Sequence, residues 1–127
     1  MEEAGTVTLS IRKKEITSRY IQELDKHINE LRLGQTTRAL EIRDFASILH
    51  IHPAHLSNTI KEVTGQSTCD LFENRLVSLA KELLLNTTMP ISEIASQLTY
   101  DPSNFTKFFK HFTGTTPKKF REQHSNS

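Results

Sequence analysis

The sequence predicts an all-α fold in which one helical unit is used twice. Apolar residues recur at intervals of three and four through most of the chain, the period of an amphipathic helix. No stretch of useful length alternates apolar and polar residues as a half-buried strand would. A segment of 26 residues also repeats 49 positions further along. A chain of 127 residues is therefore one small domain or two sub-domains of about half that size.

The helices can be placed in order from their apolar spacing and their end signals. Residues 1–17 are polar and aperiodic, which indicates a linker or a disordered N-terminus. Residues 18–31 carry apolar side chains at helical spacing, with Ser18 in the position of an N-cap. Further helices are expected, in order, over residues 42–49, 53–63, 69–86, 91–98 and 103–113, with a frayed tail after them.

The internal repeat explains how these helices are grouped. Residues 42–67 align with residues 91–116 without a gap, and eight of the 26 positions are identical. Each copy contains a short helix, a tight turn and a second amphipathic helix that starts at a proline and ends at a glycine, which is the helix-turn-helix pattern. The predicted sub-domains are residues 18–67 and 89–121, joined by a long linker helix within residues 68–88 and followed by a tail, residues 122–127.

The second helix of each copy has an apolar face and a polar face. In the second copy, Phe105, Phe108, Phe109 and Phe112 fall at i, i+3, i+4 and i+7, so we expect all four rings to face the core. The opposite face carries short polar and basic side chains. A DNA major groove admits a helix, and Asn, Lys, Ser and Thr side chains can bond to base edges there. The candidate base-reading residues are Ala54, Ser57, Asn58 and Lys61 in the first copy and Ser103, Asn104, Thr106, Lys107 and Lys110 in the second.

The net charge is close to neutral, but the basic residues are unevenly distributed. The whole chain carries a formal charge of +1, and residues 1–63 hold nine Lys or Arg and nine Asp or Glu. Residues 102–121 hold five Lys or Arg and no carboxylate. A basic surface on a nearly neutral protein points to an anionic partner that is met at one place. The candidates for phosphate contacts, which fix register without reading sequence, are Lys110, Lys118, Lys119 and Arg121.

Other classes of site are not supported by the residue pattern. We find no catalytic constellation and no phosphate-binding glycine loop, so neither an enzyme nor a cofactor is predicted. His50, His52 and His55 surround a turn, but this spacing is weak evidence for a metal. His52 instead matches the N-cap position that Asp101 holds in the second copy. The sequence therefore predicts a binding protein without a metal.

Cysteine content and hydropathy indicate the compartment. Cys69 is the only cysteine, which excludes an internal disulfide, and we expect its thiol to be buried. No apolar run approaches the roughly 18 residues of a membrane span, and the N-terminus lacks the apolar core of a signal peptide. We therefore expect a soluble, cytoplasmic protein that does not contact a membrane.

Three ordered stretches of the sequence carry a family resemblance. They read "FASILHIHPAHLSNTIKEVTGQS", "RLVSLAKELLLNT" and, after "ISEIA", "SNFTKFFKHFTGTTPKKFR". In this order they resemble the first unit, the linker helix and the second unit of the paired helix-turn-helix domain of the AraC/XylS family of bacterial transcription regulators. The resemblance covers about residues 20–121, which is most of the chain.

The resemblance implies a structure and a role. It implies about seven helices, with two recognition helices in successive major grooves roughly 34 Å apart. It implies sequence-specific binding to double-stranded promoter or operator DNA, in this family usually for transcriptional activation. It further implies RNA polymerase and an N-terminal sensor or dimerisation domain as partners.

Three positions depart from the family pattern. The turn position usually held by glycine is His50 in the first copy and Thr99 in the second. If this position needs a positive φ, histidine is tolerated but the β-branched threonine is strained. Asn58 stands where relatives often carry arginine, so we expect a contact to adenine there rather than to guanine or phosphate.

A second function from a different class also fits the sequence. The chain could be a helical module that contacts another protein, such as a polymerase subunit or a sensor, and binds DNA weakly or not at all. The nearly neutral first copy fits this alternative better than the basic second copy does. Salt dependence discriminates between the two, because a protein that neutralises several phosphates loses affinity steeply as salt rises.

Overall fold

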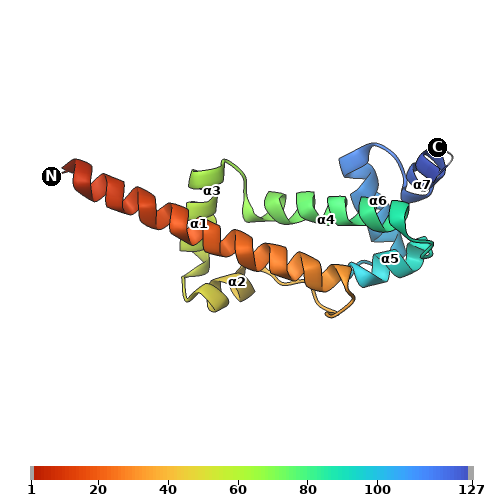
Figure 1. Ribbon diagram of the computed structural model, residues 1–127, viewed down its shortest axis with the longest axis horizontal. Coiled ribbons are helices and arrows are strands. Elements are labelled where there is room, and N and C mark those ends of the chain that lie inside the picture. Colours follow the sequence, from red (N-terminus) through yellow and green to blue (C-terminus); the bar gives the residue numbers. More distant parts are fainter. Residues whose placement is uncertain (1, 126–127) are drawn as a thin grey trace. The chain divides into compact units, whose positions relative to one another are not determined.

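The fold consists of seven helices in the computed structural model, which describes residues 2–125 (Figure 1). In chain order they are α1 (Glu2–Arg32), α2 (Ile42–Leu49), α3 (Pro53–Thr64), α4 (Thr68–Asn86), α5 (Ile91–Gln97), α6 (Pro102–Thr113) and α7 (Pro117–Ser125). No strand occurs among the described residues, so the all-α prediction and the number of helices are confirmed. In this part of the chain, no helix combines the length and apolar character that a membrane span needs.

The prediction of a linker or disordered segment over residues 1–17 is wrong, because α1 is helical from Glu2 onward. Tertiary contacts explain the error. Ile16 and Thr17 are buried, and the Lys13 ammonium donates to both carboxylate oxygens of Glu62 in α3 at 2.9 Å. Local periodicity over residues 1–17 is weak, so these contacts to a distant helix could not be read from the segment itself.

The prediction of a frayed tail is also corrected for the residues that the structure describes. Helix α7 continues through Ser125, whereas a tail was expected from residue 122. The hydroxyl of Thr116 caps this helix by accepting a hydrogen bond from the Lys119 amide at 3.2 Å. Phe120 is buried and its ring lies edge-on to Phe109 at 5.3 Å between centroids. The remaining tail residues, 126–127, lie outside the described part of the chain.

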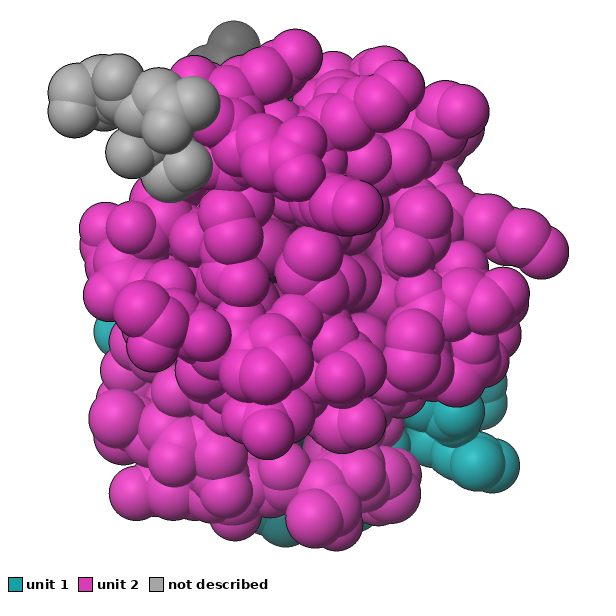
Figure 2. Space-filling view, turned by 90° about the vertical axis from the view of Figure 1, so that its right-hand side faces the viewer, with its two compact units in different colours: residues 1–27, 40–72 teal, residues 28–39, 73–127 magenta. Residues whose placement is uncertain are grey.

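The chain divides into two compact units, which Figure 2 distinguishes by colour. Unit 1 contains residues 1–27 and 40–72, and unit 2 contains residues 28–39 and 73–127. Helices α1 and α4 both contribute residues to each unit. The helix predicted as a linker within residues 68–88 is also part of a core, because most of α4 packs into unit 2 through Leu76, Leu79, Ala80, Leu83 and Leu84.

The internal repeat produces two equivalent helix-turn-helix cores. The repeat-related pairs Ala46 and Ala95, Leu49 and Leu98, Leu56 and Phe105, and Ile60 and Phe109 are all at most 4% exposed. The backbone agrees as well, since residue 51 donates to the carbonyl of residue 46 at 2.9 Å and residue 100 donates to that of residue 95 at 2.8 Å. Each core therefore has the same construction. A small alanine lies where the two helices meet, and large apolar residues of the second helix pack against it.

The turn of each unit contains a residue with left-handed backbone geometry. His50 has φ 58° and Thr99 has φ 71°, so the positive φ expected at this position occurs in both units. A non-glycine residue in this region is strained, and the strain is greatest for a β-branched side chain. Thr99 is thus a point where the local sequence opposes the fold.

We expect Thr99→Gly to stabilise the chain by about 1 kcal/mol, because relief of the strain outweighs the extra entropy of glycine in the unfolded state. His50→Gly should have a smaller effect, since histidine tolerates this geometry better than threonine. Urea unfolding of the two variants and the parent chain measures both values. A lower midpoint for Thr99→Gly than for the parent would contradict this explanation.

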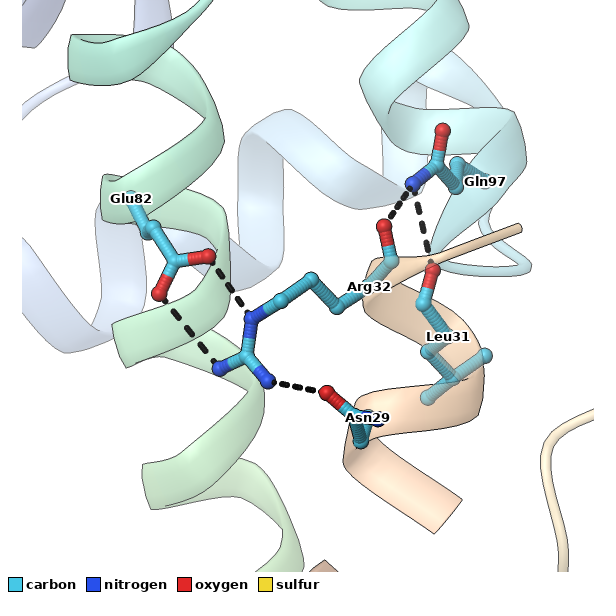
Figure 3. Close-up of polar contacts among 5 residues, drawn as sticks. All are labelled: Asn29, Leu31, Arg32, Glu82 and Gln97. Atoms are coloured by element: carbon cyan, nitrogen blue, oxygen red, sulfur yellow. Dashed lines mark hydrogen bonds and ion pairs between the residues drawn. The ribbon is translucent and has the colours of Figure 1, made fainter. Parts of the chain in front are cut away.

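Polar contacts hold the end of α1 within unit 2 (Figure 3). The Arg32 guanidinium donates to the Glu82 carboxylate of α4 through Nε at 2.7 Å. The side-chain amide of Gln97 in α5 donates to the carbonyls of Leu31 at 3.1 Å and Arg32 at 2.8 Å. The last carbonyls of a helix lack intrahelical donors, so Gln97 caps the end of α1 from a helix 65 residues away in sequence.

Candidate nucleic-acid interface

The first candidate recognition helix is α3, and its ends are well defined. The His52 ring accepts a hydrogen bond from the Ala54 amide through Nδ1 at 3.2 Å, so His52 is the N-cap that the repeat predicted. Gly65 ends the helix with φ 77°. Four sequence-predicted residues share the outward face of α3: Ala54, Asn58 and Lys61, which are exposed, and Ser57, which is half-buried. Lys61 also donates to the Gly65 carbonyl at 3.2 Å.

The second candidate recognition helix, α6, also begins at a side-chain cap and ends at a glycine. The carboxylate of Asp101 caps it by accepting from the Asn104 amide at 2.9 Å, and the Asn104 side chain also donates to this carboxylate. Gly114 ends the helix with φ 79°. The structure places the five sequence-predicted residues on the outward surface, where Ser103, Asn104, Lys107 and Lys110 are exposed and Thr106 is half-buried. Asn104 is thus partly used in the cap.

The phenylalanine face of α6 is buried at Phe105 and Phe109 and reaches the surface only in the last turn. Phe105 and Phe109 are completely buried, as predicted. Phe108 is half-buried and stacks on Tyr100 with 5.0 Å between ring centroids. Phe112 is 36% exposed, and its repeat partner Val63 is 37% exposed. The last turn of each recognition helix therefore extends beyond its core, and the expectation that all four rings face the core is corrected for Phe112.

The predicted phosphate contacts at the C-terminal end differ in their surroundings. Lys118 and Lys119 are exposed in the first turn of α7. Arg121 instead donates through Nε to the Leu84 carbonyl at 2.9 Å and through a terminal nitrogen to the Met89 carbonyl at 2.6 Å. Longer contacts of its other terminal nitrogen reach the carbonyls of residues 83 and 87. Arg121 therefore caps the end of α4, so its guanidinium already donates to backbone carbonyls, and its phosphate contact stays a prediction.

The residues considered for metal or thiol chemistry are also placed by the structure. Among the described residues, no group of three or more His, Cys, Asp or Glu side chains is arranged to hold a metal ion. Cys69 is exposed near the start of α4, so the expectation of a buried thiol is wrong. The helical period does not show whether the Cys69 side chain is buried. Burial in the first turn of α4 depends on what packs against that turn.

Sequence reasoning missed two basic residues beside α3. Arg12 and Arg19 of α1 lie next to the turn between α2 and α3, where they line a groove with His52 and His55. Arg12 belongs to the segment that was expected to be a linker, and the run Arg12-Lys13-Lys14 was the signal that could have drawn attention to it. The position of these side chains could not be predicted while the segment was expected to be a linker, because it depends on α1 packing beside α3.

Comparison with known proteins agrees with this geometry. The family model described as a helix-turn-helix domain matches residues 45–123. A transcriptional regulator of the helix-turn-helix type from Bacillus subtilis, YfiF, is 30% identical over 111 residues, which are 87% of this chain and 34% of the relative. The chain thus spans about a third of that protein's length.

Two solved structures share the fold. The C-terminal domain of AraT, a response regulator from Geobacillus stearothermophilus, has a TM-score of 0.74 and 31% identity, over 85% of this chain and 84% of that one. The DNA-binding domain of AdpA, solved in complex with a target DNA, has a TM-score of 0.72 over 84% of this chain and 93% of that one. At 14% identity this second likeness shows the fold alone. With the matching family model and two equivalent helix-turn-helix units, the chain belongs to the AraC-type family of helix-turn-helix regulators.

Proposed function

We propose that this chain binds double-stranded DNA sequence-specifically and regulates transcription, with α3 and α6 in successive major grooves. The observation that carries the proposal is the equivalence of the two helices. Each buries one face, begins at a side-chain cap, ends at a left-handed glycine and presents short polar or basic residues outward. A major groove accommodates such a helix, and two grooves on one side of a duplex are roughly 34 Å apart.

The outward residues support different roles in the two units. Asn58 can form two hydrogen bonds to adenine, and Ser57 can bond to either kind of base edge. Lys107 and Lys110 can donate to guanine or to phosphate. Lys118 and Lys119 suit the adjacent phosphates, because they lie on α7, next to the candidate recognition helix rather than on it. Unit 1 would thus contribute mainly base reading, and unit 2 would contribute both reading and charge.

The proposal is tested by selecting ligands from a random duplex library and remeasuring the selected sequences across a salt series. Two enriched boxes about one helical turn apart, with a steep loss of affinity as salt rises, are the expected result. The double variant Lys107→Gln/Lys110→Gln should reduce the salt slope by about 0.9 for each phosphate that is no longer neutralised. A single box would restrict reading to one unit, and no enrichment would overturn the proposal.

Asn58→Ala should weaken binding to the selected duplex by about 1–3 kcal/mol and relax base preference at one position. The physical reason is that the two hydrogen bonds to one base disappear while the phosphate contacts remain. Asn74→Ala is the matched control, because Asn74 is exposed and belongs to α4 rather than to either candidate recognition helix. Competition binding against duplexes changed at each position measures both effects, and an unchanged preference would exclude base reading by Asn58.

The second candidate function is a helical protein-interaction module. It is favoured by the weakly charged outward face of α3, where Lys61 is the only cation and already bonds to a backbone carbonyl. Exposed apolar residues on α2 and α3, namely Ile48 and Val63, also fit this reading. A shallow salt slope with no sequence enrichment would support it.

The wider role also belongs to the proposal. As an AraC-type output domain, the chain would work by non-covalent binding rather than catalysis, in the cytoplasm of a bacterium. An N-terminal sensor or dimerisation domain and RNA polymerase are the further partners that such a role requires. Activation is the expected sign of regulation.

A further inference from the structure

A basic groove lies between α1 and the turn that precedes α3, and the proposed function does not use it. Its volume is about 520 Å³. The polar lining residues are Arg12, Glu15 and Arg19 from α1 and His50, His52 and His55 from the turn and the start of α3. All six residues are exposed.

An ion pair joins helix α1 to α3. The Lys13 ammonium pairs with Glu62 near the end of α3, at 2.9 Å to each carboxylate oxygen. Ile16, one turn further along α1, is 6% exposed and forms part of the groove floor. Because these contacts lie close to Arg12 along the helix, the segment that carries the groove's arginines has a defined position relative to α3.

The groove is lined with hydrogen-bond donors suited to phosphate. Arginine presents a planar fork of N–H groups that matches phosphate oxygens. The Nδ1 atom of His52 accepts from the Ala54 amide, so the other ring nitrogen, Nε2, is the one left to donate. Glu15 is the one carboxylate in the lining and lies between Arg12 and Arg19 at helical spacings of three and four residues.

The groove borders the predicted reading face of α3. His55 lines the groove, and Asn58 lies three residues further on, which makes the two side chains neighbours on the helix surface. A helix in a major groove is flanked by the sugar-phosphate strands that form the groove walls. The arginines therefore lie on the side of α3 where one such strand would pass.

We propose that Arg12 and Arg19, supported by His52 and His55, bind backbone phosphates of the DNA strand beside the box that α3 reads. This inference rests on the proposed function and extends its DNA interface onto α1. It also accounts for how unit 1, with one lysine on the outward face of α3, would be held in register. An acidic protein segment is the competing occupant, but continuity with the reading face favours DNA.

The test compares three variants on the duplex selected by the parent chain. Arg12→Gln/Arg19→Gln removes the two cations, and we expect about tenfold weaker binding and a salt slope smaller by about 1.8, at about 0.9 for each contact. Glu15→Gln removes the carboxylate between them and should strengthen binding. Arg12→Lys/Arg19→Lys keeps both charges and should retain most of the salt slope, which separates charge from loss of helix structure.

The matched control is Lys14→Gln/Lys26→Gln. It also removes two exposed cations from α1, but neither residue lines the groove. Hydroxyl-radical footprinting adds a positional readout, because protection of the sugars beside the α3 box should disappear only in Arg12→Gln/Arg19→Gln. Circular dichroism at the assay temperature checks that every variant is folded.

The outcomes separate this inference from the proposed function. If the parent chain selects no duplex, both are overturned. If the parent chain selects a duplex with a steep salt slope and Arg12→Gln/Arg19→Gln behaves like the parent chain or like the control, only the phosphate site on α1 is overturned, and the groove is left to an acidic protein segment. Weaker binding confined to Arg12→Gln/Arg19→Gln, with tighter binding for Glu15→Gln, supports the site.

Discussion

Replacing Phe109 with alanine is expected to lower the free energy of unfolding by about 3–5 kcal/mol. The Phe109 ring is completely buried and contacts two other rings, with centroid distances of 6.0 Å to Phe105 and 5.3 Å to Phe120. Truncation therefore removes apolar burial and leaves a cavity where α6 and α7 meet. Since a small domain has a total stability of about 5–15 kcal/mol, the loss expected for this one ring is a large share of that total.

Phe112→Ala is the matched control for this prediction. Phe112 lies on the same helix, but 36% of its surface is exposed, so its truncation should cost less than about 1.5 kcal/mol. Equilibrium urea unfolding followed by far-ultraviolet circular dichroism measures both values. Equal losses for the two variants would show that the core of unit 2 is not centred on Phe109.

Replacing Arg121 with methionine is expected to destabilise the chain by about 2–4 kcal/mol, because hydrogen bonds to a charged donor are strong and their acceptors would lose their partner. Leu84 lies in the last turn of α4, where carbonyls lack intrahelical donors, and its carbonyl accepts from Arg121 at 2.9 Å. The Met89 carbonyl in the following segment accepts from the same side chain at 2.6 Å. Methionine keeps much of the stem but cannot donate.

Lys119→Met is the control, since it removes one positive charge from an exposed position of the same helix. In thermal unfolding, the free energy of unfolding of Arg121→Met should be well below that of the parent chain. That of Lys119→Met should be within about 0.5 kcal/mol of the parent value. At a temperature where both variants are folded, Lys119→Met should affect DNA binding more than Arg121→Met does. Lys119→Met should reduce the salt slope and Arg121→Met should leave it unchanged. A reduced slope for folded Arg121→Met would show that Arg121 contacts phosphate in addition to capping α4.

The repeat allowed much of the local structure to be predicted. The pairing of Pro53 with Pro102 and of Gly65 with Gly114 located both ends of each recognition helix, and His52 was assigned as a cap by its alignment with Asp101. Positive φ at His50 and Thr99 was expected because both stand where the family usually has glycine. These features are local, since caps and turns are determined by residues within a few positions of one another.

Long-range contacts could not be predicted in the same way. Arg121 and Lys119 are two residues apart in a basic segment, yet one caps α4 and the other is exposed. The difference depends on the position of the end of α4, which lies more than 30 residues earlier in the chain. By residue type both are basic side chains that could contact phosphate. Only the packing of the helices shows that Arg121 is a cap and Lys119 is exposed.

The sequence by itself determined the all-α class, the two helix-turn-helix units, the polar faces of their second helices and the family. The helical periodicity shows which side of each helix is apolar, and the ungapped repeat shows that the same arrangement occurs twice. The tertiary structure alone decided that residues 2–17 continue α1, that Arg12 and Arg19 lie beside α3, that Arg121 is a cap and that Cys69 is exposed. Each of these depends on contacts between distant segments, which local residue patterns do not encode.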